Sequence, residues 1–243
     1  MLELTEVTVR FGGNVAVDRV SFGAEAGRVT ALIGPNGAGK TTIFNVISGL
    51  LPPTSGSVAL DGRDLSGMAP HRRARLGLAR TFQRLELFSA LTVRDNVLVA
   101  SEIYRGWSRA RVRPRSEVAR LLERVGLSDR ADERVDQLPT GQARLVELAR
   151  ALATHPKVLL LDEPASGLDD AETDDVARLL TELAAEGITV MLVEHDVHLV
   201  MRVSQIIHVL DFGRLIAGGP PEEIRENKDV IEAYLGSELS DAG

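Results

Sequence analysis

The chain has 243 residues, of which 44% are apolar and 26% are charged, and this is enough for one large globular domain with an appended subdomain. Its formal net charge of -7 argues against a nucleic-acid partner, because proteins that bind nucleic acids usually carry a basic surface. No cysteine is present, which excludes disulfides and a cysteine nucleophile, and the longest apolar runs fall well short of the roughly 18 residues that a membrane-spanning helix needs.

The first thirty residues predict a small antiparallel layer of strands. Met1 is followed by an acidic segment instead of a basic and then apolar one, so we expect no secretory signal. Apolar and polar residues alternate over residues 2–4 and 7–11, which is typical of half-buried strands. The Phe-Gly-Gly-Asn run at residues 11–14 predicts a turn.

A phosphate-binding loop follows the apolar strand predicted over residues 29–33. Its glycines let successive backbone N–H groups face a polyphosphate, Lys40 neutralises the outer phosphates, and the Thr41 hydroxyl is placed to ligate Mg²⁺. A strand before the loop and a helix-forming run from Ile43 after it favour a nucleoside triphosphate site over a glycine-rich turn that binds nothing. The candidate binding residues are Gly34, Pro35, Asn36, Gly37, Ala38, Gly39, Lys40, Thr41 and Thr42.

A helical insertion follows this first part of the nucleotide core. Residues 52–56 end the first helix, and residues 57–62 predict a short strand with a turn. Apolar residues then recur at helical spacing within residues 118–125, and residues 144–152 predict a second helix. A group of arginines in the insertion could contact an anion or a lipid headgroup, although a solvated polar loop is the favoured interpretation. The group consists of Arg105, Arg109, Arg111, Arg113 and Arg115.

Two apolar strands, at residues 158–161 and 188–193, return the chain to the core. A helix predicted from about residue 172 to 186 separates them, and this strand, helix, strand order implies a parallel sheet. We therefore predict a single α/β domain. Its parts are a nucleotide-binding core (residues 1–86 and 156–220), a helical subdomain (residues 87–155) and a C-terminal helix and tail (residues 221–243).

Four polar side chains near strand ends are candidates for the chemistry. Asp162 and Glu163 follow a buried strand at the edge where open α/β sheets bind ligands. Asp162 is placed to hold Mg²⁺, and Glu163, which would point the other way in an extended strand, can activate the attacking water. His195 could bind a γ-phosphate, and Gln83 could reach the metal or the water. On these residues alone, an acidic turn, a structural histidine and an uninvolved glutamine stay open as alternatives.

The order and spacing of these motifs resemble those of the ATP-binding subunits of ABC transporters, over essentially the whole chain. The resemblance rests on the phosphate-binding loop, Gln83, Leu-Pro-Thr-Gly-Gln at residues 138–142, Leu-Asp-Glu-Pro at 161–164, Ser-Gly-Leu-Asp at 166–169 and His195. Residues 80–97, Ala165 and the ending at 221–236 look like the ATP-binding subunit of branched-chain amino acid importers. Urea and amide importers share much of this pattern, so they stay open as alternatives.

This resemblance implies a P-loop NTPase of the ABC type, with a mostly parallel sheet core, an N-terminal antiparallel β layer and a helical subdomain. It implies ATP and Mg²⁺ as cofactors and a head-to-tail dimer with a second ATP-binding subunit, identical or different. It implies that closure of the dimer reaches transmembrane permease subunits through the helical insertion, at the cytoplasmic face of the cell membrane. No nucleic acid is expected as a partner, and the solute and its direction stay open.

The resemblance also implies a role for each residue of the site. Phe11 stacks on adenine, while Lys40 and Thr41 hold phosphate and metal. Asp169 signals across the dimer. The catalytic and metal-supporting set consists of Asp162 for Mg²⁺, Glu163 for the water, His195 for the γ-phosphate, and Gln83 for sensing that phosphate and coupling to the membrane subunit. Such roles agree with phosphoryl transfer, which needs mainly positioning and charge stabilisation.

The loop at residues 138–142 departs from the family's Leu-Ser-Gly-Gly-Gln signature. The serine hydroxyl that would reach the partner's γ-phosphate is missing, and Pro139 lacks an N–H. Thr140 offers a displaced hydroxyl, and Gly141 and Gln142, with the dipole of the following helix, can still face phosphate. We therefore expect this loop to cap ATP with weaker closure and slower turnover than a consensus loop.

Other classes of function match less well. ATPase heads of DNA-repair and translation factors share the signature, but they are usually interrupted by long coiled coils or duplicated, and neither pattern is present. A GTP switch would need Asn-Lys-x-Asp, whereas residues 227–229 carry the acid one place early. A non-catalytic regulator is disfavoured because both Glu163 and His195 are present.

Overall fold

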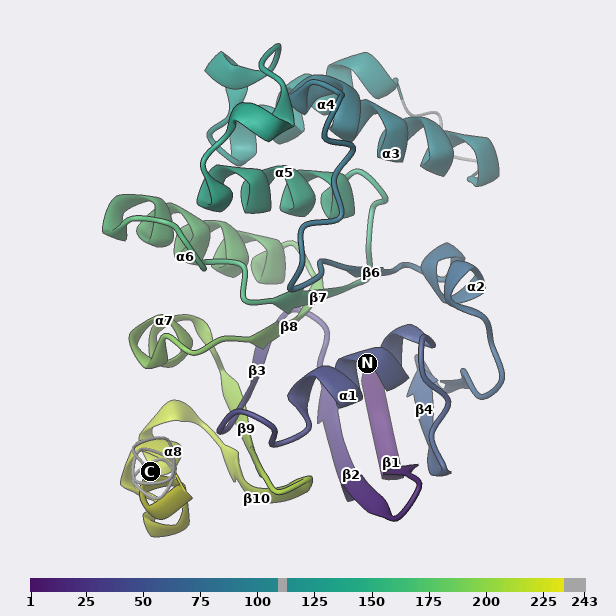
Figure 1. Ribbon diagram of the computed structural model, residues 1–243, viewed down its shortest axis with the longest axis vertical. Coiled ribbons are helices and arrows are strands. Elements are labelled where there is room, and N and C mark those ends of the chain that lie inside the picture. Colours follow the sequence, from purple (N-terminus) through teal and green to yellow (C-terminus); the bar gives the residue numbers. More distant parts are fainter. Residues whose placement is uncertain (109–112, 234–243) are drawn as a thin grey trace.

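The computed structural model describes residues 1–108 and 113–233. Two of the grouped arginines, Arg109 and Arg111, and the expected end of the C-terminal segment beyond residue 233 lie outside the described residues. Within the described ranges the chain forms a four-stranded sheet and a six-stranded sheet, with most of the helices gathered around the larger one (Figure 1).

The four-stranded sheet contains the antiparallel layer predicted at the N-terminus. Strands β1 (Leu2–Phe11) and β2 (Asn14–Ala24) pair across the predicted turn at residues 11–14. Two later strands extend the layer to the order β2-β1-β4-β5, because β4 (Ser55–Leu60) pairs with β1 and β5 (Arg63–Asp64) pairs with β4. The sheet therefore includes two strands that lie beyond the phosphate-binding loop in the sequence.

The six-stranded sheet has the order β10-β9-β3-β8-β7-β6, and all neighbours except β9 and β10 pair in parallel. Strands β3, β7 and β8 are buried throughout, which explains their continuous apolar runs. These three strands were predicted, whereas β6, β9 and β10 were missed. The strands are β3 (Val29–Ile33), β6 (Leu78–Arg80), β7 (Val158–Asp162), β8 (Thr189–Val193), β9 (Ile206–Asp211) and β10 (Arg214–Gly219).

Helices α3, α4 and α5 lie together at one end of the molecule (Figure 1) and fall inside the predicted insertion. Helix α6 begins earlier than expected, because Asp169 and Glu172 form a capping box. In the part of the chain that the structure describes, no helix has the length and apolar character needed to cross a membrane. The labelled α-helices are α1 (Lys40–Ser48), α2 (Pro70–Arg75), α3 (Val93–Trp107), α4 (Pro114–Arg124), α5 (Thr140–Leu152), α6 (Asp170–Ala185), α7 (Val197–Val203) and α8 (Pro221–Glu226), and residues 228–233 are helical as well.

Helix α1 lies between the two sheets, where the fully buried Phe44 packs in a core that both sheets share. The C-terminal end of α1 is held by Arg73, which is buried on α2. A cation at this position complements the unsatisfied carbonyls and the negative end of the helix dipole. Arg73 donates hydrogen bonds to the carbonyl oxygens of Val46 and Ile47 (both 2.8 Å, from Nη1), Leu65 (2.9 Å, from Nη2) and Met68 (3.0 Å, from Nε).

Candidate functional site

The phosphate-binding loop joins the end of β3 to the start of α1 and has a tightly curved backbone. Gly34 and Gly39 have φ of 148° and 106°, and there is no room for a side chain at either position. A Cβ at Gly34 would lie 2.0 Å from the Leu210 carbonyl oxygen, and one at Gly39 would lie 2.7 Å from that of Ala16. No side chain caps the N-terminus of α1, so its first N–H groups are left to face a ligand.

The Lys40 side chain is folded into this loop. Its Nζ donates to the carbonyl oxygens of Gly34 (2.6 Å) and Pro35 (2.9 Å), and the residue is only 7% exposed. Burial lowers the pKa of Lys40 below its ordinary value, while Glu163 and Asp162 act in the opposite direction. Two carboxylates therefore lie near enough to the lysine to stabilise its charged form.

A cavity of about 280 Å³ opens beside the loop, and residues from four other segments contribute to its lining. Most of its lining comes from residues 36–42, and Gln83, Glu163 and His195 complete the polar part of the wall. Three candidates that are far apart in the sequence thus meet at the predicted phosphate site. Phe11 does not line this cavity; it lies at the β1–β2 turn with 53% of its surface exposed.

Glu163 is the centre of this polar group. Its Oε1 atom accepts a hydrogen bond from Gln83 Nε2 (3.2 Å) and lies 3.0 Å from His195 Nε2. Strand β7 ends at Asp162, and Glu163 has a left-handed backbone with φ of 52°, so the extended geometry considered for it does not occur. A left-handed glutamate is uncommon and costs free energy, which is typical of functional positions.

Asp162 is almost fully buried, at 1% exposure. Its Oδ2 atom accepts from Arg80 Nη2 at 3.2 Å, and its backbone N–H donates to the Thr81 hydroxyl at 3.2 Å. Burial raises the pKa of the Asp162 carboxyl, and the neighbouring Arg80 guanidinium opposes this rise. Arg80 was not predicted as part of the site, although a charged residue in the otherwise uncharged segment 78–82 was a signal for it.

The signature loop lies at the start of α5 and outside this cavity. Pro139 is the N-cap residue and makes no side-chain capping bond, and Thr140 is exposed. Gly141 packs so closely on the 166–169 segment that a Cβ would lie 2.4 Å from the Gly167 carbonyl oxygen. Asp169, expected to signal across a dimer, caps α6 by accepting from the Glu172 N–H at 2.8 Å. Gln142 Nε2 donates to Glu172 Oε1 at 3.3 Å.

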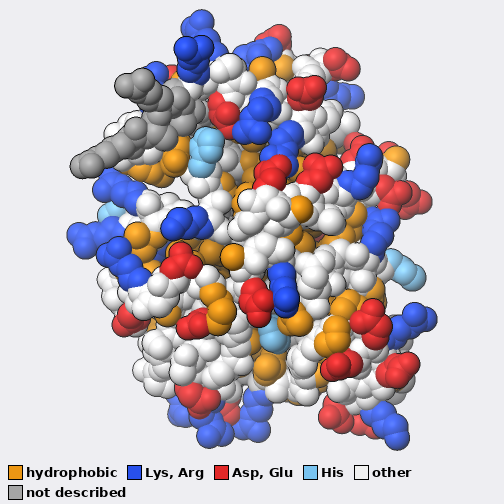
Figure 2. Space-filling model, turned by 180° about the vertical axis from the view of Figure 1, so that it is seen from behind, with side chains coloured by type: hydrophobic (Ala, Val, Ile, Leu, Met, Phe, Trp, Pro, Cys, Tyr) orange, Lys and Arg blue, Asp and Glu red, His pale blue; other side chains and the backbone are white. Residues whose placement is uncertain are grey.

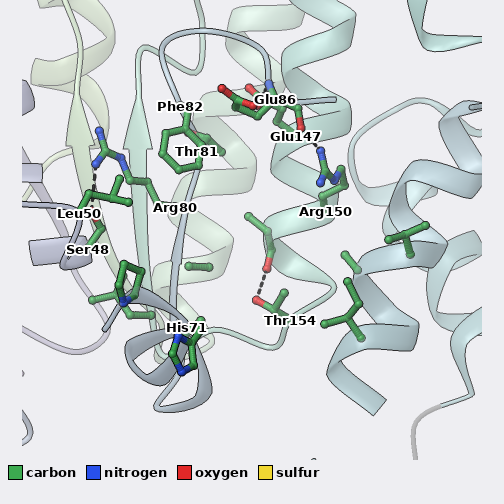
Figure 3. A pocket seen from close by; sticks show the side chains of 18 of the residues that line it. Ser48, Leu50, His71, Arg80, Thr81, Phe82, Glu86, Glu147, Arg150 and Thr154 are labelled. Atoms are coloured by element: carbon green, nitrogen blue, oxygen red, sulfur yellow. Dashed lines mark hydrogen bonds between the residues drawn. The ribbon is translucent and has the colours of Figure 1, made fainter. Parts of the chain in front are cut away.

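A second cavity, of about 400 Å³, lies between α2, α3, α5 and the segment after β6 (Figure 3). We call it the Phe82 groove; its lining includes Leu50, Phe82, Phe88, Ile103 and Glu147. Glu147 is buried, its Oε1 accepts from the Glu86 N–H at 2.8 Å, and its Oε2 has no hydrogen-bond partner among the described residues. Burial raises the pKa of this carboxyl. Gln83 directly follows Phe82, so the groove and the phosphate-side cavity meet along one short segment.

The donor set suits a nucleoside triphosphate with a hard cation. A hydroxyl on Thr41, a carboxylate on Asp162 and an amide on Gln83 offer the oxygen atoms that Mg²⁺ prefers. Asp162 Oδ1 accepts no hydrogen bond from the residues that the structure describes, so one carboxylate oxygen is available to a cation. The curved loop, its buried lysine and these oxygens together fit a magnesium-bound triphosphate.

Comparison with known proteins assigns most of the sequence to one family. The family model described as ABC transporter matches residues 17–166. A second model, described as branched-chain amino acid ATP-binding cassette transporter, matches residues 214–239. The high-affinity branched-chain amino acid transport ATP-binding protein BraF of Pseudomonas aeruginosa is 43% identical over 249 residues, which cover 97% of this chain and 98% of BraF.

Solved structures show the same relationship. The ADP conformation of MJ1267, an ATP-binding cassette of an ABC transporter, has a TM-score of 0.85 and 31% identity, over 97% of this chain and 98% of that chain. A dimeric post-hydrolysis state of the ATP-binding cassette MJ0796, bound to ADP and Pi, has a TM-score of 0.82 and 27% identity, over 91% and 99% of the two chains. The likeness extends over nearly the whole chain.

Proposed function

This chain belongs to the ABC transporter family as an ATP-binding subunit that hydrolyses ATP, and from that membership we propose that it powers the uptake of branched-chain amino acids through membrane permease subunits. The observation that carries the ATP-driven part of the proposal is the meeting of Glu163, His195 and Gln83 beside the phosphate-binding loop. A base, a γ-phosphate contact and a sensing amide are the groups that water attack on a bound triphosphate needs.

In this proposal each residue of the site binds, orients or moves a proton. The loop N–H groups and Lys40 hold the phosphates, and Phe11 offers an exposed aromatic face for the base. His195 and Gln83 orient the γ-phosphate and the attacking water, and Glu163 takes the proton of that water as its oxygen bonds to phosphorus. Thr42 and the other loop residues supply backbone contacts.

We assign Mg²⁺ to Thr41, Asp162 and Gln83. Across residues 1–108 and 113–233, no group of three or more His, Asp or Glu residues is arranged to hold a metal ion alone. A cation here would therefore share its coordination with phosphate oxygens and water, as Mg²⁺ usually does. When bound, it supplies charge stabilisation to the transferred phosphoryl group.

A second ATP-binding subunit would complete the site. Thr140 and Asp169 are exposed and lie outside the cavity that their own chain forms, and Gly141 and Gln142 lie beside them at the start of α5. A partner packed head to tail would bring these residues to the nucleotide, and the dimeric MJ0796 cassette supports such a pair. Pro139 leaves the helix N-terminus without a side-chain cap, so its N–H groups remain available to the partner's phosphate.

The Phe82 groove is the surface that we assign to the permease subunits. It contains three exposed apolar side chains, those of Leu50, Phe88 and Ile103, which a partner helix can cover. Lys and Arg side chains gather at the edge where α2 lies (Figure 2), and α2 contributes exposed Arg72 and Arg75. This arrangement supports peripheral binding at the cytoplasmic face of the cell membrane, with residues 87–155 as the helical subdomain that transmits closure.

The proposed cargo is a branched-chain amino acid. The support comes from the relative's name, from the second family model over residues 214–239, and from the segments around Gln83 and the C-terminus. Reconstitution with the permease subunits tests this cargo, because leucine, isoleucine or valine should stimulate ATP hydrolysis more than urea does. Stimulation by urea alone would replace the cargo while leaving the ATPase in place.

Substitution Glu163→Gln tests the catalytic assignment. The variant should bind ATP as the unaltered chain does and accumulate as a closed dimer, while hydrolysis falls by orders of magnitude, because the amide cannot accept the proton of the water. The measurements are phosphate release, nucleotide affinity and dimer formation by gel filtration with ATP. Exposed Glu223→Gln is the matched control and should leave all three unchanged. Retained hydrolysis in Glu163→Gln would move the base role to another residue.

A further inference from the structure

Arg80 is a buried arginine that joins two parts of the proposed site. Its side chain is 5% exposed and pairs with Asp162, whose side chain is 2% exposed. Nη1 donates to Asn45 Oδ1 (2.7 Å) and to Ser48 Oγ (3.1 Å), and Nη2 donates to Asp162 Oδ2 (3.2 Å). One guanidinium therefore connects α1, which follows the phosphate-binding loop, to the end of β7.

The contact with Arg80 fixes one oxygen of the Asp162 carboxylate and leaves the other oxygen without a hydrogen bond from the described residues. Oδ2 is bound by the guanidinium, whereas Oδ1 accepts no hydrogen bond from the described residues. A carboxylate held at one oxygen by a rigid fork cannot rotate freely about its side-chain torsions. Arg80 thus determines which way the second oxygen of Asp162 faces.

Arg80 also touches the wall of the Phe82 groove. Its guanidinium carbon lies 5.0 Å from the centre of the Phe82 ring and 5.5 Å from that of the Phe44 ring. Figure 3 shows Arg80 reaching from β6 toward Ser48, with Phe82 beside it on the same strand-to-loop segment. Such cation–π contacts stabilise a guanidinium most where water is excluded. Movement of Phe82 therefore changes the surroundings of Arg80 directly.

We propose that Arg80 is a positioning residue, which orients Asp162 toward Mg²⁺ and is itself positioned by Phe82 in the groove. This inference rests on the proposed function, because it takes Asp162 as a magnesium-supporting carboxylate. It gives a continuous physical connection, from Phe82 through Arg80 to Asp162, between a groove that a partner can occupy and the oxygen atoms around the nucleotide. A chain of contacts alone does not establish coupling, so the test must measure it.

The experiment measures the affinity of a fluorescent ATP analogue in EDTA and across a Mg²⁺ titration, for the full chain and its variants. Arg80→Met should raise the apparent Kd for Mg²⁺ by roughly tenfold or more, the usual effect of losing a residue that orients a metal ligand. Arg80→Lys should give a smaller increase, because an ammonium cannot contact Asn45, Ser48 and Asp162 in one plane. Nucleotide affinity in EDTA should stay within twofold in both, which also shows that they are folded.

Exposed Arg84→Met is the matched control and should leave the Mg²⁺ titration unchanged. If Arg80 only neutralised Asp162, its removal would tighten Mg²⁺ binding; tighter or unchanged binding in Arg80→Met overturns the inference. If nucleotide binding by the unaltered chain does not depend on Mg²⁺, the chain has no magnesium site. That result would contradict the proposed function separately, and it would also overturn this inference.

A double-mutant cycle tests the connection to the groove. Phe82→Leu should weaken Mg²⁺ binding in the unaltered background and have no further effect in the Arg80→Met background. Paramagnetic Mn²⁺, followed by electron paramagnetic resonance, can replace Mg²⁺ as a direct probe of metal binding that does not depend on hydrolysis. Additive effects of the two substitutions would show that Phe82 does not act through Arg80 and would overturn that part of the inference.

Discussion

Removal of the Arg73 side chain should destabilise the chain through the end of α1. In Arg73→Met, the carbonyl oxygens of Val46 and Leu65 keep a second donor, from the N–H groups of Gly49 (3.1 Å) and Met68 (3.0 Å). Those of Ile47 and Met68 lose the donor that Arg73 provides. A buried carbonyl left unsatisfied costs about 1–3 kcal/mol; the Ile47 carbonyl is buried and the Met68 carbonyl is part-buried, so together they cost about 2–5 kcal/mol.

Burial of a guanidinium is itself unfavourable, and it lowers the pKa of Arg73. Replacement by an apolar side chain recovers part of that desolvation cost, so we expect a net loss of about 3 kcal/mol in the free energy of unfolding. For a chain of this length, such a loss lowers Tm by roughly 6–12 °C.

Urea unfolding without nucleotide, followed by circular dichroism, measures the loss for Arg73→Met. Arg72→Met is the matched control, because Arg72 is exposed on the same helix and should change stability by no more than about 0.5 kcal/mol. An Arg73→Met variant as stable as this control would show that water satisfies these carbonyls equally well, and would refute the capping argument.

Two further predictions concern the signature loop and pH. The double substitution Pro139→Ser with Thr140→Gly restores the hydroxyl and the glycine of the family pattern, so dimerisation on ATP or the hydrolysis rate should rise; no change in either refutes the expected weakness of the loop. The ring of His208 lies 4.6 Å from that of Phe22, centre to centre, and burial lowers the pKa of His208 below its ordinary value. His208 therefore binds a proton more readily in the unfolded chain than in the folded chain. The free energy of unfolding falls as the pH drops below about 6.5, the ordinary pKa of histidine, by at most about 1.4 kcal/mol per pH unit for this group. His208→Leu should reduce the difference between the urea midpoints measured at pH 7.5 and pH 5.5. A difference equal to that of the unaltered chain would contradict this prediction.

Continuous motifs made the main parts of the site predictable. The loop around Lys40 and the acidic pair at Asp162 each combine a strand, a turn and the candidate side chains within a few residues, so local sequence was sufficient to single them out. The resemblance to a known family then supplied Gln83 and His195, which local pattern alone left open. The structure adds that both of these contact Glu163 through a single oxygen atom.

The features that the sequence analysis missed are short or depend on distant contacts. Strand β6 has three residues, one of which is Arg80, so neither length nor alternation marks it. The pairing of Arg80 with Asp162 spans 82 positions, and no spacing rule predicts such a contact. The left-handed backbone of Glu163 was also unpredictable, because it is a conformation that the residue type disfavours and that the surrounding structure imposes.

The hydrogen bonds of Lys40 to its own loop have a consequence for affinity. Because the ammonium group already binds the carbonyl oxygens of Gly34 and Pro35, a phosphate that engages it exchanges one set of partners for another. The gain from this lysine is then a difference between two sets of contacts, which is smaller than the attraction between isolated charges. The same hydrogen bonds from Lys40 hold the phosphate-binding loop in its curved form before ATP arrives. Binding of ATP therefore requires little further ordering of the backbone.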